Sequence, residues 1–200
     1  GVYLGITAAV RHRLGRNDLH GVHVAMQGTG SVGGGVARLL AKAGAKLTIA
    51  DVDGRKAEAL AAELGAKVVA ADAIIGVPCD VFSPNALGAI LNPENIGALD
   101  CAVVAGGANN QLARAEHGAL LVERGILYAP DYVINAGGII DVALEYLGRQ
   151  SGAPYTTAEV NRRIELIPER LEAIWQESAA SGVSPDKVAD HMAQKLIGRA

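Results

Sequence analysis

The sequence from residue 22 to residue 33 reads Val22-His23-Val24-Ala25-Met26-Gln27-Gly28-Thr29-Gly30-Ser31-Val32-Gly33. An apolar run precedes three glycines with the spacing G-x-G-x-x-G, and helix-like periodicity continues to residue 43. We therefore predict a strand, a glycine turn and a helix. In such a unit Gly28 makes the tight turn, Gly30 lets the backbone approach a pyrophosphate, and Gly33 lets the helix pack close to the strand.

An acidic residue completes this pattern. Asp51 follows an apolar run at residues 46–50 and lies 18 residues after Gly33. Phosphates would bind N–H groups of the helix that begins near Ser31, and Asp51 would accept hydrogen bonds from the adenosine ribose. A carboxylate at the position of a 2′-phosphate favours NAD over NADP. The predicted cofactor-binding residues here are Gly28, Thr29, Gly30, Ser31, Val32, Gly33 and Asp51.

The rest of the chain alternates strands with helices, which predicts an α/β fold. We expect a doubly wound parallel (Rossmann) sheet with strand order 3-2-1-4-5-6, its ligand site at the carboxyl ends, and extra C-terminal helices. Helices are predicted at residues 2–15, 54–64, 112–124, 137–147, 156–178 and 185–197. Pro168 should kink or restart the helix at 156–178, whose apolar stripe fits either the sheet domain or a partner domain.

We predict a division into an NAD-binding domain at residues 1–148, with a leading helix at 1–16, and a C-terminal helical segment at 149–200. The chain opens without methionine, directly into a helix-like run. We therefore expect a domain of a longer polypeptide, whose N-terminal substrate and catalytic domain is absent here.

Composition argues against several classes of function. The chain has 200 residues, 50% of them hydrophobic and 20% charged, with a formal net charge of −3. This charge gives no reason to expect nucleic acid or a membrane as a partner. The five histidines lack metal-ligand spacing, so no metal site is predicted. Cys79 and Cys101 are interpreted as isolated small apolar residues, which favours a reducing, cytoplasmic location.

Four further motifs carry a family resemblance. They are Gly1-Val2-Tyr3-Leu4-Gly5, Cys79-Asp80-Val81-Phe82-Ser83-Pro84, the run at residues 104–112 that contains Gly106-Gly107-Ala108-Asn109-Asn110, and Pro130-Asp131-Tyr132-Val133-Ile134-Asn135-Ala136-Gly137-Gly138. With the glycine turn, they resemble the glutamate/leucine/phenylalanine/valine dehydrogenases, most closely the branch acting on hydrophobic amino acids. The likeness covers essentially the whole chain.

The resemblance implies a function for the full-length protein. Such an enzyme would be an NAD-dependent oxidoreductase that reversibly deaminates a hydrophobic L-amino acid to a 2-oxo acid and ammonia. The family's catalytic lysine and aspartate belong to the absent domain. We therefore assign no catalytic residue here and expect this chain alone to be inactive. The resemblance also implies a homo-oligomer in the full-length protein.

The resemblance extends the predicted site to the nicotinamide and the substrate. The further cofactor-binding residues would be Ser83, Pro84, Ala105, Gly106, Asn109, Asn110 and Asn135. Residues 109, 110 and 135 are otherwise explained as turn formers or helix caps. Ile139 and Val142 would contact the substrate and favour a branched-chain side chain, although both also fit an ordinary core. Asn85 stands where the branch more often has Cys, and we expect this difference to affect only packing beneath the adenine.

Two other hypotheses about the function remain open at this point. A Rossmann module that senses NAD without chemistry would explain the missing catalytic groups, but not the loops at residues 109–110 and 131–138. A two-domain hydroxy acid dehydrogenase would normally carry an Arg and a His–acid pair at the strand ends, which we do not find.

Overall fold

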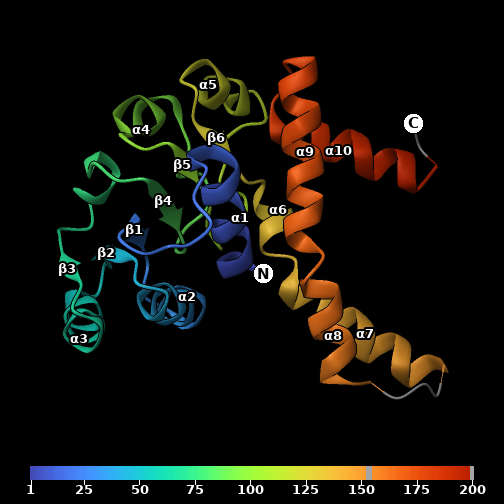
Figure 1. Ribbon diagram of the computed structural model, residues 1–200, viewed down its shortest axis with the longest axis horizontal. Coiled ribbons are helices and arrows are strands. Elements are labelled where there is room, and N and C mark those ends of the chain that lie inside the picture. The colour runs from blue at the N-terminus through green and yellow to red at the C-terminus, as the bar shows by residue number, and fades with distance from the viewer. Residues whose placement is uncertain (152–154, 199–200) are drawn as a thin grey trace.

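The computed structural model describes residues 1–151 and 155–198. Its six strands form one parallel sheet in the order β3-β2-β1-β4-β5-β6, as predicted (Figure 1). Because β1 lies between β2 and β4, the strand order reverses beside it, and ligands of such sheets bind at this point. The strands are β1 (His23–Gln27), β2 (Lys46–Ala50), β3 (Lys67–Val68), β4 (Val81–Pro84), β5 (Val103–Val104) and β6 (Leu127–Tyr128).

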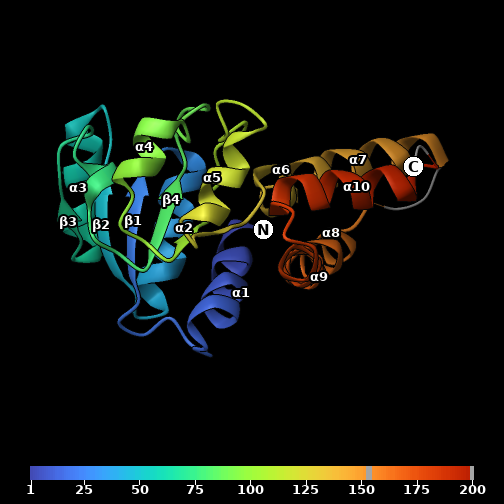
Figure 2. The same ribbon diagram turned by 90° about the horizontal axis from the view of Figure 1, so that it is seen from above.

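Alternate residues of the central strands face opposite sides of the sheet, and each side has its own core. Val24 and Val81 belong to one buried cluster with residues of the helices α1 (Val2–Leu14), α2 (Ser31–Lys42) and α9 (Ile167–Ser181). Ala25 and Phe82 belong to a second cluster with residues of α4 (Pro93–Ala98) and α5 (His117–Glu123). Helices therefore cover both faces, as the apolar runs of a buried parallel sheet require (Figure 2).

The helices of the first 134 residues are α1 (Val2–Leu14), α2 (Ser31–Lys42), α3 (Gly54–Leu64), the 3₁₀ turn η1 (Ile74–Gly76), α4 (Pro93–Ala98), α5 (His117–Glu123) and α6 (Asp131–Ile134). Among them, α1, α2 and α3 follow the predicted boundaries closely, whereas the helix predicted at 112–124 is shorter and α6 was not predicted. Gly15 and Gly65 end α1 and α3 in the left-handed conformation, with φ of 66° at each. These are the stops expected where glycine follows a helical run.

The helix predicted at residues 112–124 begins only at His117. Leu112 instead forms a bridge with Leu91, and the N–H of Ala113 donates to the Leu91 carbonyl at 3.1 Å. A partner about twenty residues earlier thus satisfies the backbone of this segment. Helical periodicity contains no information about such a contact, so the prediction was wrong there.

After α6, the described part of the chain continues as four helices that lie to one side of the sheet (Figure 2). They are α7 (Gly137–Ser151), α8 (Thr157–Ile164), α9 (Ile167–Ser181) and α10 (Pro185–Leu196). Pro168 stands at the start of α9, so it restarts the helix predicted at 156–178, one of the two expected outcomes. α7 continues four residues beyond its predicted end at residue 147, residues 152–154 lie outside the described residues, and the division of the chain at residue 148 stays a prediction.

The apolar stripe of α9 packs on the sheet domain. Ile167, Leu171 and Trp175 are buried in the core cluster that contains α1. The indole N–H of Trp175 donates to the Tyr128 carbonyl of β6 at 2.8 Å, which fixes α9 against the end of the sheet. This decides between the two partners considered for the stripe. In the described part of the chain, no helix has the length and apolar character needed to cross a membrane.

Candidate functional site

The glycine turn connects β1 to α2 at the point where the strand order reverses. Gly28 has φ of 93°, which a side chain would disfavour, and its N–H donates to the Ala50 carbonyl at 2.8 Å. A Cβ on Gly33 would lie 2.1 Å from the Gly28 carbonyl oxygen. The first and third glycines therefore have the roles expected of them, a tight turn and close packing of the helix.

The space around Gly30 and the start of α2 is suited to an anion. Nothing lies within 4 Å of the position of a Cβ on Gly30, and Gly30 is exposed. No side chain caps α2, and among the described residues nothing accepts a hydrogen bond from the N–H groups of Ser31, Val32 or Gly33. These groups and the positive end of the helix dipole are what a pyrophosphate requires. A dinucleotide therefore fits this end of the sheet.

Asp51 lies beside the turn, as predicted, and the turn itself holds its carboxylate. Oδ2 accepts hydrogen bonds from the N–H of Thr29 at 2.7 Å and from its hydroxyl at 2.8 Å. Oδ1 accepts from the N–H of Asp53 at 2.9 Å. Burial opposes ionisation, but these hydrogen bonds outweigh it, so the pKa of Asp51 is lowered. This link to Thr29 was not predicted, although a hydroxyl inside the glycine motif was a signal for it.

On the other side of β1, the structure brings Asn109 and Asn135 together. The amide Nδ2 of Asn135 donates to Oδ1 of Asn109 at 2.9 Å and to the carbonyl of Gly107 at 2.8 Å. Asn110 makes no such contact with them. It is exposed with φ of 52°, and its carbonyl accepts from the N–H of Ala89 at 2.7 Å.

Ser83, Pro84, Ala105 and Gly106 are all buried, so their side chains do not line an open surface. Ser83 and Pro84 are the last residues of β4 and not the turn after it, because Pro84 pairs with Gln27 in the sheet. A Cβ on Gly106 would lie 2.2 Å from the Pro84 carbonyl oxygen. These four residues form the supporting layer of the site, and their contact with a cofactor stays a prediction.

Gln111, in the motif at residues 104–112, has a structural role that was not predicted. It is fully buried, and its Nε2 donates to the carbonyls of Gly106 and Ala108 at 2.8 and 2.9 Å. Its own N–H donates to Oδ2 of Asp131 at 3.0 Å, which links this loop to α6. Since Asn135 follows α6 directly, Gln111 helps to place it.

A cavity of about 340 Å³ connects the two sides of the site. Ser31 and Val32 at the start of α2, Asn135, and Gly137–Gly138 at the start of α7 line it together with residues of α1 and α2. Ile139 and Val142 lie farther along α7 and are 66% and 60% exposed. They are therefore not ordinary core residues of this chain, and their contact with a substrate stays a prediction.

Other candidate groups lie outside this site. The six lysines (Lys42, Lys46, Lys56, Lys67, Lys187 and Lys195) are all exposed, as expected of solvated charges. Cys79 and Cys101 are unoxidised but not isolated, because the two half-buried thiols lie close enough to shift each other's pKa. Among the described residues, no cluster of His, Cys, Asp or Glu is suited to hold a metal ion.

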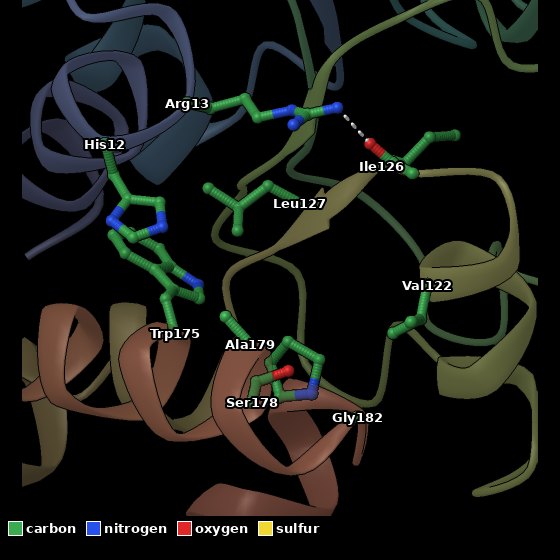
Figure 3. Close-up of a pocket in the computed structure, with 11 residues that line it drawn as sticks. His12, Arg13, Val122, Ile126, Leu127, Trp175, Ser178, Ala179 and Gly182 are labelled. Carbon is green, nitrogen blue, oxygen red and sulfur yellow. Dashed lines mark hydrogen bonds between the residues drawn. The ribbon is translucent and has the colours of Figure 1, made fainter.

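A second cavity of about 340 Å³ lies between α1, β6 and α9 (Figure 3). Three polar groups around it already have partners. Arg13 donates to the Gly125 carbonyl at 2.6 Å, Trp175 donates to Tyr128 at 2.8 Å, and Ser178 donates to the Val183 carbonyl at 2.6 Å. This cavity offers no set of free polar groups comparable to the start of α2.

Known proteins resemble the chain in sequence and structure. The family model for Glutamate/Leucine/Phenylalanine/Valine dehydrogenase matches residues 52–200. Leucine dehydrogenase from Thermoactinomyces intermedius is 43% identical over 98% of this chain and 52% of its own length, and phenylalanine dehydrogenase from the same organism is 37% identical over 98% and 53%. The crystal structure of L-tryptophan dehydrogenase from Nostoc punctiforme has a TM-score of 0.92 at 39% identity, covering 98% of this chain and 58% of that one. The chain thus spans about half the length of the curated relatives it matches.

Proposed function

Because the chain belongs to the Glutamate/Leucine/Phenylalanine/Valine dehydrogenase family, we propose that it is the NAD-binding part of an amino acid dehydrogenase. The full-length enzyme would interconvert a hydrophobic L-amino acid with its 2-oxo acid and ammonia. When bound, the nicotinamide accepts or returns the hydride of the substrate Cα. This chain binds and orients the cofactor, and the groups that transfer protons lie in the part of the protein not present here.

The adenosine end of the cofactor would lie along the turn between β1 and α2. The free N–H groups of Ser31, Val32 and Gly33 would bind the pyrophosphate, and Gly30 leaves the space for it. Asp51 would accept hydrogen bonds from the ribose hydroxyls, since a carboxylate oxygen has more than one lone pair. The carboxylate disfavours the 2′-phosphate of NADP. Arg55, a cation near Asp51 that could offset it, is exposed, and so is Lys56, whose charge helps to lower the pKa of Asp51.

The observation that carries this proposal is the placement of Asp51. Two hydrogen bonds from Thr29 hold its carboxylate beside the glycine turn, within the same unit that leaves the α2 N–H groups free. A strand–turn–helix without a ligand needs neither feature. Membership of the family disfavours an NAD sensor and a hydroxy acid dehydrogenase, the two alternatives from the sequence.

We also propose that the substrate is a branched-chain amino acid. Ile139 and Val142 are three residues apart on α7, are β-branched, and present exposed apolar surface on one side of the helix. Bulky side chains leave less room for an aromatic ring than a small residue would. The relatives named above act on leucine, phenylalanine or tryptophan, so their names alone do not choose among these substrates. We further propose a homo-oligomer for the full-length protein.

Calorimetric titration of the chain with NAD and NADP tests the cofactor assignment. We expect NAD to bind at least tenfold more tightly, because NADP would place a phosphate against Asp51. Equal dissociation constants would contradict the role of Asp51. The same preparation should not turn over leucine, valine or phenylalanine. Measurable deamination above background would contradict the proposal that the proton-transfer groups lie outside this chain.

A further inference from the structure

Asn85 follows β4 and lies where the turn of β1, the start of α2 and the loop after β5 meet. Its N–H donates to the Gln27 carbonyl at 2.7 Å, which continues the pairing of β4 with β1. A Cβ on Gly33 would lie 3.1 Å from the Cβ of Asn85, so Asn85 packs directly beneath the glycine turn. Asn85 thus lies next to β1 and β4, on the opposite side of β1 from β2 and Asp51. The expectation that it would affect only packing beneath the adenine does not describe this position.

The side-chain amide of Asn85 uses both its donor and its acceptor. Nδ2 donates to the backbone carbonyl of Ser83 at 2.9 Å and to the Ser83 hydroxyl at 3.0 Å. Oδ1 accepts from the N–H of Gly107 at 2.9 Å. The amide therefore connects the end of β4 to the loop after β5 by hydrogen bonds of normal length.

Gly107 continues this connection toward α7. Its carbonyl accepts a hydrogen bond from Nδ2 of Asn135 at 2.8 Å, and the same Nδ2 donates to Asn109 at 2.9 Å. One peptide group thus receives the Asn85 amide on its N–H side and the Asn135 amide on its carbonyl side. We call Asn85, Gly107, Asn135 and Asn109 the amide chain. It lies on the side of β1 away from Asp51.

We propose that Asn85 is a positioning residue for the nicotinamide half of the cofactor, acting through the Gly107 peptide on Asn135. This inference rests on the proposed function. Other residues at position 85 would not make the same connection. Alanine would leave the N–H of Gly107 and the buried Ser83 hydroxyl without this partner, and aspartate would turn an acceptor toward the Ser83 carbonyl. A cysteine carries no group that both donates and accepts at these distances.

The adenosine half of the site has its own supports. Thr29 and Asp53 hold Asp51, and no hydrogen bond links Asp51 to the amide chain in the described part of the structure. Loss of Asn85 should therefore weaken contacts to one half of the cofactor and leave the other half intact. A general loss of fold would weaken both halves.

The test compares NAD with ADP-ribose, which lacks the nicotinamide, on the wild-type chain and on Asn85→Ala. We expect Asn85→Ala to weaken NAD about tenfold, the scale of one lost hydrogen bond to a buried partner. The dissociation constant of ADP-ribose should change less than twofold. Asn92→Ala is the matched control, because Asn92 caps α4 through the N–H of Asn95 and belongs to neither half of the site.

Two further measurements keep the inference falsifiable. If Asn85→Ala does not fold, Asn85→Asp should also lose affinity for NAD selectively, because its carboxylate has no N–H for the Ser83 carbonyl, is repelled by it, and is no longer held in place to accept from Gly107. By NMR, amide exchange of Gly107 should accelerate in Asn85→Ala and not in Asn92→Ala. Equal losses for NAD and ADP-ribose, or unchanged NAD binding in a folded variant, would overturn the role of Asn85 alone. A wild-type chain that binds neither ligand would overturn the proposed function, and this inference with it.

Discussion

Asp51→Asn is the substitution that separates the shape of the Asp51 side chain from its charge. Asp51 accepts three hydrogen bonds, two from Thr29 at 2.7 and 2.8 Å and one from the N–H of Asp53 at 2.9 Å. An asparagine has only one accepting oxygen, so it can accept from Thr29 or from Asp53 but not from both, and its NH₂ group faces the remaining donor. The substitution therefore removes at least one of the three bonds and leaves the packing almost unchanged.

The expected loss of stability follows from the hydrogen bonds that are removed. Hydrogen bonds to charged groups contribute about 1.5 to 3 kcal/mol when they are buried. Asp51 is partly exposed, so solvent screening reduces this, and we expect roughly 1 to 2 kcal/mol in total. For a chain of this size the melting temperature should fall by about 2 to 8 °C. Differential scanning calorimetry measures this change directly.

The expected loss of cofactor affinity is larger than the loss for a surface acid. Asp51→Asn should weaken NAD by about 10- to 100-fold, equal to about 1.4 to 2.7 kcal/mol. It should also reduce the preference over NADP, because the repulsive charge is gone. Asp53→Asn is the control: Asp53 lies at the N-cap position of α3 without a side-chain capping bond and forms an ion pair with Lys56 at 3.8 Å, and this change should leave both affinities within twofold. If Asp51→Asn bound NAD as tightly as the wild type, or lost no more than Asp53→Asn, the reasoning would be refuted.

Three further predictions concern the pH dependence of Asp51, the reactivity of the two cysteines and the choice of substrate. The pKa of Asp51 is lowered in the folded state, so its stabilising effect is present above the unfolded value near 3.8 and is lost as pH falls through the folded pKa. The difference in unfolding free energy between wild type and Asp51→Asn should therefore be constant above about pH 5 and disappear in stronger acid. A constant difference down to about pH 2 would contradict this. The pKa of Cys101 is lowered, chiefly because the Cys79 thiol donates to it, whereas hydrogen bonding and burial raise the pKa of Cys79. Iodoacetamide should therefore modify Cys101 first, and mass spectrometry that shows Cys79 alkylated first would disprove this prediction. In the full-length enzyme, kcat/KM should be higher for leucine and valine than for phenylalanine, and Ile139→Ala should raise kcat/KM for phenylalanine by about 10-fold. A wild type that prefers phenylalanine, or a variant without this gain, would contradict the substrate assignment.

The sequence was most informative where a single backbone requirement selects a residue type. Gly28 needs a positive φ and Gly33 needs close contact with the turn, so their spacing, together with the apolar runs on either side and Asp51, predicted the unit that contains them. The alternation of strands with helices similarly predicted the order of the six strands. These features depend on residues close together in the chain, and local patterns contain that information.

The parts that could not be predicted depend on contacts between distant segments. Leu112 pairs with Leu91, which shortens α5 in a way that no helical pattern contains. The hydroxyl of Thr29 meets Asp51 only because β1 and β2 are neighbours in register. Asn85 departs from the residue more often found in the family motif, and only the hydrogen bond from the N–H of Gly107 to its side-chain oxygen indicates a role for it.

A crystal structure of the chain with NAD bound tests the central claim most directly. The account predicts the pyrophosphate on the N–H groups of Ser31, Val32 and Gly33, the adenosine ribose on Asp51, and the nicotinamide beside Asn135. Cofactor density elsewhere, for example in the cavity between α1, β6 and α9, or a pyrophosphate displaced from the start of α2, would contradict it.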